Sequence, residues 1–260
     1  MNRIDQAFRR LRARKEKALI AYLTVGFPTL RALPALVRAC EEAGVDVLEL
    51  GIPFSDPLAD GPTIQAASQR ALEQGVTPAQ VLAQVKKLRR SGTRLPLALM
   101  TYFNPVLHYG VERFCRDAAA SGADGVIVPD LPPEEAGELR VSARRAGLDT
   151  IFLASPVSTP ARLKRIAQAS TGFIYFVSLT GVTGKRDAMV YHWLAPLRQL
   201  RKMTRLPICL GFGISKALHV QRAVKYADGV IVGSALLEVV RRSGPQGAGR
   251  FLRRLKEACR

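Results

Sequence analysis

Three carboxylates follow one another closely at the end of a short apolar run. The stretch LELGIPFSDPLADGPTIQ (48–65) places Glu49 between two leucines, and then Asp56 and Asp60 on a segment that contains three prolines. A carboxylate within an apolar run loses hydration, which raises its pKa and suits it to proton transfer near neutral pH. Because proline restricts the backbone, the two aspartates are expected on a stiff loop. The pattern indicates acid–base chemistry by carboxylates.

Glycines in two later segments predict an anion site. LGFGISKA (210–217) places glycines between a strand-like run and a helix opened by Ser215, and VGSALLEVV (232–240) puts Gly233 and Ser234 at the first turn of a short helix. Bare backbone N–H groups and the positive end of a helix bind phosphate without a cationic side chain. Since the helix-end field contributes only about 0.3–2 kcal/mol, hydrogen bonds must supply most of the affinity.

Two further features could contact the part of a ligand that is not the phosphate. The polar segment SLTGVTGKRDA (178–188) could order over a ligand and exclude water, or be a plain mobile loop. Apolar and aromatic side chains near the strand ends suggest a flat hydrophobic ligand portion, although core packing is the ordinary role of any single one. These candidates are Tyr22, Met100, Tyr102, Phe152, Tyr175 and Phe212.

The elements that must position these residues repeat along the chain. Eight short apolar runs occupy 18–26, 46–51, 96–103, 125–130, 149–155, 172–178, 207–213 and 229–234. Each is nearly continuous, as in parallel strands covered on both faces, and helical patterns separate them. Joints such as EEAGVD and ASGADG recur, and ADGVIV occurs twice. Eight βα units predict a (β/α)8 TIM barrel as one domain over 1–260; a doubly wound sheet is the alternative.

In such a barrel the strand C-termini share one rim, where the chemistry occurs. If Leu48 and Leu50 face the helices, the pleat turns Glu49 into the barrel mouth. The alternatives are a Glu49 that pairs with an arginine from a loop, an Asp60 that caps the helix starting near Thr63, and an Asp56 that is a solvated turn residue.

The ends of the chain and its charge bear on location and partners. Ile4, Phe8 and Leu11 repeat at helical spacing, which predicts an extra N-terminal helix packed on the body rather than a targeting segment, and hence a cytoplasmic protein. No apolar run approaches the length of a membrane span. About eleven of the eighteen net positive charges lie in 1–17 and 240–260. Without a recognition motif, we expect a basic solvated exterior rather than nucleic-acid binding.

The remaining polar residues restrict the chemistry. Four cysteines, at 40, 115, 209 and 259, are far apart and form no CxxC pair, which favours buried thiols over a metal site. No strand contains the lysine that Schiff-base catalysis would need, and His108 alone among the histidines lies in a rim loop. No dinucleotide fingerprint is present. Cofactor-free proton transfer by a lyase or isomerase remains.

Several motifs together resemble those of the tryptophan synthase alpha subunit, in collinear order from about Ile4 to Leu237. They are LELGIPFSDPLADGPTIQ, LMTYFNPVLHYG, VPDLPPEE, TGVTG, GFGIS and ADGVIVGSA. The first is close to diagnostic, whereas GFGIS and GSA are shared more widely among phosphate-binding barrels. The resemblance implies a retro-aldol cleavage of indole-3-glycerol phosphate to indole and glyceraldehyde 3-phosphate, without a cofactor or metal.

The resemblance also implies roles for particular residues. Glu49 would be the general acid/base for the glycerol hydroxyl proton and indole C3, and Asp60 would accept a hydrogen bond from the indole N–H. Tyr175 and Phe212 would line the substrate site, and Thr183 would belong to the closing loop. The phosphate would be held by Gly184, Gly213, Gly233 and Ser234.

A partner is implied as well. Family members usually pair with a beta subunit in an alpha2beta2 heterotetramer, to which indole passes through a tunnel and which alone holds pyridoxal phosphate. The loops around Pro53, Asp56, Asp130 and Pro132 would face that partner. A stand-alone lyase, another phosphate-binding barrel such as a sugar-phosphate isomerase, and a basic nucleic-acid-binding scaffold are the alternatives.

One departure from the family pattern stands out beside the high charge. The family commonly has Gly-Asp-Pro after the first strand, where this chain has Gly26-Phe27-Pro28. The loss of that carboxylate puts a helix cap or a local hydrogen bond in doubt, and we expect an exposed phenyl ring.

Overall fold

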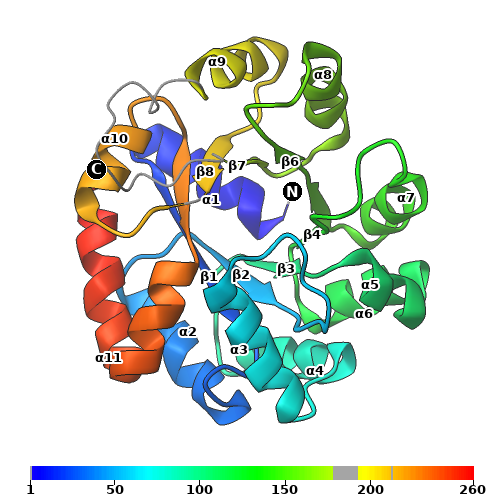
Figure 1. The fold of residues 1–260 in the computed structure, drawn as a ribbon, viewed down its shortest axis with the longest axis vertical. Helices are drawn as coiled ribbons and strands as arrows, with labels where there is room; N and C mark the ends of the chain where they lie inside the picture. Colours follow the sequence, from blue (N-terminus) through cyan, green and yellow to red (C-terminus); the bar gives the residue numbers. More distant parts are fainter. Residues whose placement is uncertain (1, 178–192, 212) are drawn as a thin grey trace.

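The structure, a computed structural model, describes residues 2–177, 193–211 and 213–260. Within them nine strands form one parallel sheet that curves into a barrel surrounded by helices (Figure 1). The strands are β1 (Ala18–Thr24), β2 (Val47–Gly51), β3 (Leu97–Met100), β4 (Gly125–Ile127), β5 (Asp149–Ile151), β6 (Leu153–Ala154), β7 (Ile174–Val177), β8 (Ile208–Gly211) and β9 (Gly229–Val232). The predicted TIM barrel is confirmed.

The closure of the barrel explains why nine strands stand where the sequence predicts eight. The sheet order is β5-β4-β3-β2-β1-β9-β8-β7-β6, so its two ends are the two halves of the predicted run 149–155. The run is interrupted at Phe152: β5 pairs with β4 before it, and β6 pairs with β7 after it. One apolar run therefore joins the two edges of the sheet.

Helices cover the outside of the barrel. They are α1 (Arg3–Arg14), α2 (Leu33–Glu42), α3 (Pro62–Glu73), α4 (Pro78–Arg90), α5 (Phe103–Tyr109), α6 (Val111–Ser121), α7 (Gly137–Ala146), α8 (Pro160–Ala169), α9 (Leu194–Met203), α10 (Ala217–Ala223) and α11 (Ser234–Glu257), with a 3₁₀ turn η1 (Leu30–Ala32). The predicted short helix after the last strand is the first part of α11, which continues past a non-helical break at Gly244. The run 96–103 ends as a strand at Met100, because α5 begins at Phe103.

The repeated joints bind each strand to its neighbour. In three of them an aspartate donates its backbone N–H to a carbonyl at the start of the neighbouring strand, and its carboxylate accepts the N–H of that same residue. The pairs are Asp46 with Leu19 (2.9 and 2.8 Å), Asp124 with Leu97 (2.7 and 2.9 Å), and Asp228 with Ile208 (2.8 and 2.9 Å). Each carboxylate also contacts a cation from a helix, namely Lys256, Arg89 and Arg201 respectively. The joint aspartate thus sets the register of parallel strands at the bottom of the barrel.

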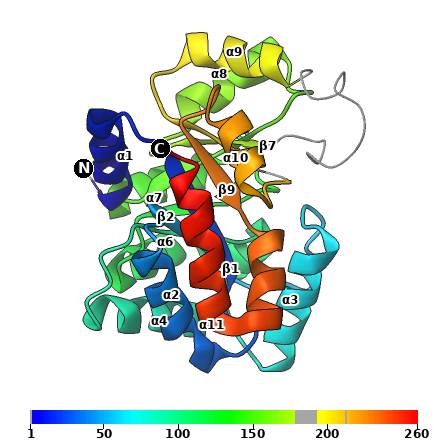
Figure 2. The same ribbon diagram turned by 90° about the vertical axis from the view of Figure 1, so that its left-hand side faces the viewer.

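Two apolar clusters follow the strand pleat. The larger lies between strands and helices and contains Leu48 and Leu50, whereas the smaller fills the barrel and contains Val47. The predicted N-terminal helix is α1, whose Ile4, Phe8 and Leu11 belong to the inner cluster. Figure 2 shows α1 on one side of the barrel and α3, which follows Asp60, on the other. Helix α1 thus closes the end of the barrel that lies opposite to the predicted site.

Three smaller expectations can be compared with the structure. The four cysteines are buried and unbridged, as predicted. The expectation of an exposed Phe27 is wrong: its ring is half-buried against the outer cluster, because the turn at Gly26 brings it back onto the apolar residues of the barrel wall. In the described part of the chain, no helix combines the length and the apolar character that a membrane span needs.

Candidate active site

Glu49 is a buried carboxylate inside the barrel mouth. It lies in β2 next to Tyr22 of β1, and both side chains line a cavity of about 380 Å³. Its exposed fraction is 0%, and neither carboxylate oxygen has a hydrogen-bond partner in the described residues. No arginine among the described residues pairs with Glu49, and Arg186 lies outside them. Burial alone raises the pKa of Glu49 to about 8.

The position of Glu49 follows from the strand pleat. Leu48 and Leu50 point outward into the cluster under the helices, which leaves the residue between them facing inward. Below it the barrel is filled by apolar side chains such as Val47 and Ala98, which cannot solvate the carboxylate. The site is thus built to favour a neutral Glu49 that can donate a proton.

Asp60 enters the same cavity from the loop between β2 and α3. Its backbone N–H donates to the Pro57 carbonyl (3.0 Å), and its own carbonyl accepts the Gln65 side-chain amide (2.9 Å). It does not cap the helix: α3 begins at Pro62 after Gly61, without a side-chain cap. Partial burial raises the pKa of Asp60 to about 6, and a hydrogen bond from Tyr102 opposes the rise.

Tyr102 supports this loop from behind. Its hydroxyl accepts the Ala59 N–H (2.9 Å), and its ring contacts Phe54 at 5.5 Å between centroids. Tyr102 is not among the residues that line the cavity. The sequence predicts that Tyr102 contacts the substrate, but the structure places it behind the cavity lining, where it supports the loop that carries Asp60.

Two tyrosines lie in spaces that glycines of the strands leave open. A Cβ on Gly51 would lie 2.1 Å from the Tyr22 hydroxyl, and one on Gly211 would lie 2.3 Å from the Tyr175 ring. Both tyrosines line the cavity, as does Met100, and these three predicted residues are brought together. Burial is the main cause that raises the pKa of both hydroxyls, so they stay protonated. Phe152 instead belongs to the outer cluster, and its candidacy as a rim residue is wrong.

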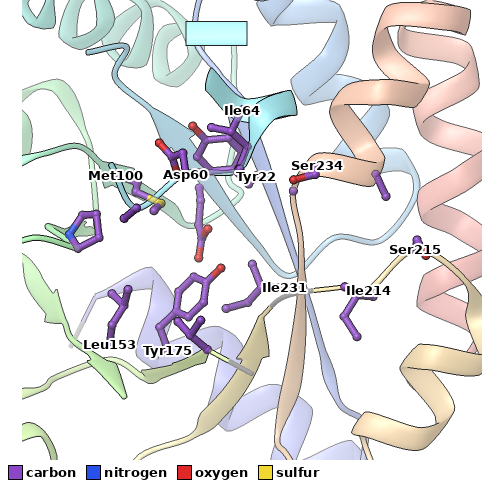
Figure 3. Close-up of a pocket in the computed structure, with 18 residues that line it drawn as sticks. Tyr22, Asp60, Ile64, Met100, Leu153, Tyr175, Ile214, Ser215, Ile231 and Ser234 are labelled. Atoms are coloured by element: carbon purple, nitrogen blue, oxygen red, sulfur yellow. The ribbon is translucent and has the colours of Figure 1, made fainter. Parts of the chain in front are cut away.

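The predicted anion site forms the opposite wall. Gly213 lies in a turn with φ +73°, and Gly233 immediately precedes the first residue of α11, Ser234. All three line the cavity together with Ile214 and Ser215. Because the first N–H groups of a helix have no partner within it, the start of α11 offers donors to an anion. Figure 3 shows Met100 and Asp60 at one side of the cavity and Ser234 and Ser215 at the other.

One detail of this wall differs from expectation. The helix after β8 begins at Ala217, not at Ser215, whose backbone nitrogen and hydroxyl each lie 3.3 Å from Nδ1 of the buried His219. None of the described residues that line the cavity is Lys or Arg, in keeping with phosphate binding by N–H groups and a hydroxyl. The predicted contacts Thr183, Gly184 and Phe212 lie outside the described residues.

Sequence reasoning missed part of the lining. Ile64, Pro129, Leu153, Val177 and Ile231 all contribute apolar surface. Leu153 begins β6 and Val177 ends β7, and both could have been found by extending the pleat. Nothing in the sequence marks Ile64, which comes from the first turn of α3. Within the described ranges, no three His, Cys, Asp or Glu side chains are grouped closely enough to hold a metal ion.

This geometry provides for one kind of ligand. A neutral acid and an ionisable carboxylate line the same cavity, and the start of α11 with the adjoining Gly213 turn lines its other side. The cavity volume is within the range of small-molecule sites. A phosphorylated molecule with a flat apolar part would match it.

Comparisons with known proteins agree with this description. The family model of the tryptophan synthase alpha chain matches residues 8–260. The tryptophan synthase alpha chain of Chloroflexus aggregans is 49% identical over 262 residues, which cover 99% of this chain and 98% of the relative. The crystal structure of tryptophan synthase subunit alpha from Legionella pneumophila superposes with a TM-score of 0.92 at 37% identity, over 100% of this chain and 98% of that one.

A structure of tryptophan synthase from M. tuberculosis in an aminoacrylate-bound form gives a TM-score of 0.91 at 36% identity, over 100% of both chains. Sequence and fold thus agree over nearly the whole length. The chain belongs to the tryptophan synthase alpha chain family.

Proposed function

We propose that this chain cleaves indole-3-glycerol phosphate to indole and glyceraldehyde 3-phosphate, with Glu49 as general acid/base and Asp60 as the group that stabilises the indole ring. The family assignment makes the chain a lyase of tryptophan biosynthesis. The roles of individual residues rest on the geometry of the cavity.

The observation that carries the proposal is the burial of Glu49 together with its protonation at neutral pH. Its two oxygens have no partner in the described chain, and its pKa is raised to about 8, so the carboxyl is mostly protonated at neutral pH. An unpaired buried carboxyl costs free energy of folding, which is a common feature of active sites. A structural role would have left it paired.

The reaction follows from these protonation states. Glu49 donates its proton to C3 of the indole ring, which leaves the ring electron-poor, and ionised Asp60 accepts a hydrogen bond from the indole N–H. The Glu49 carboxylate then takes the proton of the glycerol hydroxyl at the adjoining carbon. The carbon–carbon bond breaks as the hydroxyl becomes the aldehyde, and its electron pair restores the aromatic ring. Such acid–base assistance accelerates a reaction by roughly 10²–10⁴.

The substrate orientation is set by the two walls. The phosphate would bind at Gly213, Gly233 and Ser234, and the indole would lie between Tyr22, Met100 and Tyr175. Thr183, Gly184 and Phe212 complete the proposed site.

The test is indole release by purified chain. We expect Glu49→Gln to lose nearly all activity, because the amide can neither give nor take the proton, and Asp60→Asn to be impaired less. Glu42→Gln, an exposed change on α2, is the matched control and should behave as wild type. Substantial activity in Glu49→Gln would remove Glu49 from this role.

Family membership also implies a beta subunit as partner, and we propose that the chain works with it in a cytoplasmic alpha2beta2 heterotetramer as a single barrel domain over 1–260. Asp56 and Asp130 are exposed, Pro132 is half-exposed, and Leu58, two residues after Asp56, is 92% exposed. Pro53 is buried, which limits its own contact. The loops that carry these residues are the proposed docking surface.

Adding beta subunit tests this part. An increase in indole turnover and a larger sedimenting species are expected, and Leu58→Asp should weaken both without altering the activity of the isolated chain. No change of turnover or sedimentation would identify a stand-alone lyase.

A further inference from the structure

His219 lies beside the side of the cavity that is formed by 213–215, Gly233 and Ser234, which we call the phosphate wall. It lies on α10, is 7% exposed, and does not line the cavity. Its Nδ1 atom is 2.9 Å from the Gly213 carbonyl oxygen and 3.3 Å from both the backbone nitrogen and the hydroxyl of Ser215. A single ring nitrogen therefore contacts both ends of the turn 213–215.

The shortest of these contacts selects a tautomer. A carbonyl oxygen only accepts, so a hydrogen bond of 2.9 Å requires that Nδ1 carries a proton. A protonated Nδ1 cannot accept the Ser215 N–H, but it can share its proton with the Ser215 hydroxyl oxygen. The ring is thus a donor that holds the Gly213 carbonyl on the side of α10.

This hydrogen bond has a consequence for the next peptide. In a trans peptide the C=O and the following N–H point in opposite directions. Since the Gly213 carbonyl points toward α10, the N–H of Ile214 points away from it, and it has no acceptor in the described chain. Both residues line the cavity, next to the start of α11. The ring keeps an amide donor of the phosphate wall available.

We infer that His219 is a positioning residue for phosphate: it never touches the ligand, and it orients the 213–214 peptide whose amide side faces the proposed phosphate site. The inference deepens the proposed function and rests on it. Gly213 has a positive φ and its turn can reorient easily, so an external hydrogen bond is needed to hold one orientation.

The experiment compares two substrates in two variants. His219→Leu removes the donor, whereas His219→Asn keeps a donor nitrogen on the same branch as Nδ1. We expect His219→Leu to raise the KM for indole-3-glycerol phosphate roughly three- to ten-fold, the effect of one lost hydrogen bond. The inhibition constant of inorganic phosphate should rise equally, with kcat little changed. Cleavage of unphosphorylated indole-3-glycerol should be unaffected.

The controls separate positioning from folding. His219→Asn should recover most of the wild-type KM, and His108→Leu, an exposed histidine on α5, should match wild type. Equal impairment of both substrates, or an unchanged KM in His219→Leu, would overturn the inference. If wild type releases no indole, the proposed function fails; calorimetry with inorganic phosphate on wild type and His219→Leu then still tests the turn.

Discussion

At the scale of single residues, the burial of Glu49 has opposite effects on the reaction and on the stability of the fold. The apolar barrel interior keeps the carboxyl protonated at neutral pH, which the proposed first proton transfer requires. The same surroundings offer nothing to the ionised form. Asp60, on the half-exposed loop, has a pKa of about 6 and is ionised where Glu49 is neutral. In the proposed mechanism the two carboxylates therefore take different roles because their environments differ.

The pH dependence of activity follows from these two values. The proposed mechanism requires protonated Glu49 and ionised Asp60, so kcat/KM should fall below about pH 6 and above about pH 8. Asp60→Asn should lose the acidic limb and keep the alkaline one. A wild-type profile that stays flat from pH 5 to 9 would contradict this assignment.

The free energy of unfolding should also depend on pH, because the pKa of Glu49 differs between the folded and unfolded states. The folded pKa of Glu49, about 8, lies above its unfolded value of 4.5, so the group destabilises the fold increasingly as the pH rises from about 5 to 8. At about 1.4 kcal/mol per unit, the effect amounts to several kcal/mol at pH 8. Glu49→Gln should not show this loss of stability between pH 5 and pH 8. Denaturant unfolding of both proteins at pH 5 and 8 measures the difference, and parallel pH trends would refute the explanation.

At the scale of elements, the joints before the strands explain how the barrel keeps its register. An aspartate that brackets one residue of the neighbouring strand prevents a slip by one position, which would turn every side chain of that strand to the other face. Glu49 would then face the helices. The joint at the bottom of the barrel therefore determines which side chains reach the top.

Asp124→Ala tests the contribution of one joint. Asp124 is 2% exposed and its carboxylate contacts Arg89, whose side chain is 12% exposed, as well as the Leu97 N–H. Its removal leaves the largely buried Arg89 guanidinium with backbone carbonyls but without this carboxylate, and we expect a loss of about 3–5 kcal/mol in the free energy of unfolding. Asp117→Ala removes a carboxylate with exposed arginine partners and should cost much less. Comparable losses in the two variants would rule out a special role for the joint.

At the scale of the whole molecule, the two ends of the barrel have different tasks. The end at the strand C-termini carries Glu49, Asp60 and the phosphate wall, and the other end is closed by α1. The basic surplus is concentrated in α1 and the last part of α11, away from the acidic loop. This separation agrees with the division between chemistry and stability in barrels of this kind.

Ile4→Ala tests whether the end of the barrel that α1 closes contributes to stability and not to substrate binding. Ile4 is fully buried in the inner cluster, so its truncation should lower the free energy of unfolding by about 2–5 kcal/mol. The KM for substrate should not change, since the pocket lies at the other end. Arg9→Ala, on the exposed side of the same helix, is the control. A large KM effect in Ile4→Ala with stability retained would be inconsistent with this division.

The sequence by itself determined the barrel, its N-terminal helix and the inward direction of Glu49, because continuous apolar runs, helical spacing and the strand pleat are local patterns. Only the tertiary structure decided that Glu49 has no partner among the described residues, that Tyr102 supports the Asp60 loop and that Phe27 is half-buried. It also decided that the run 149–155 joins two edges of the sheet and that the His219 ring contacts the Gly213 carbonyl. These facts depend on contacts between segments far apart in the chain or on loop conformation, and no local pattern specifies which buried groups meet.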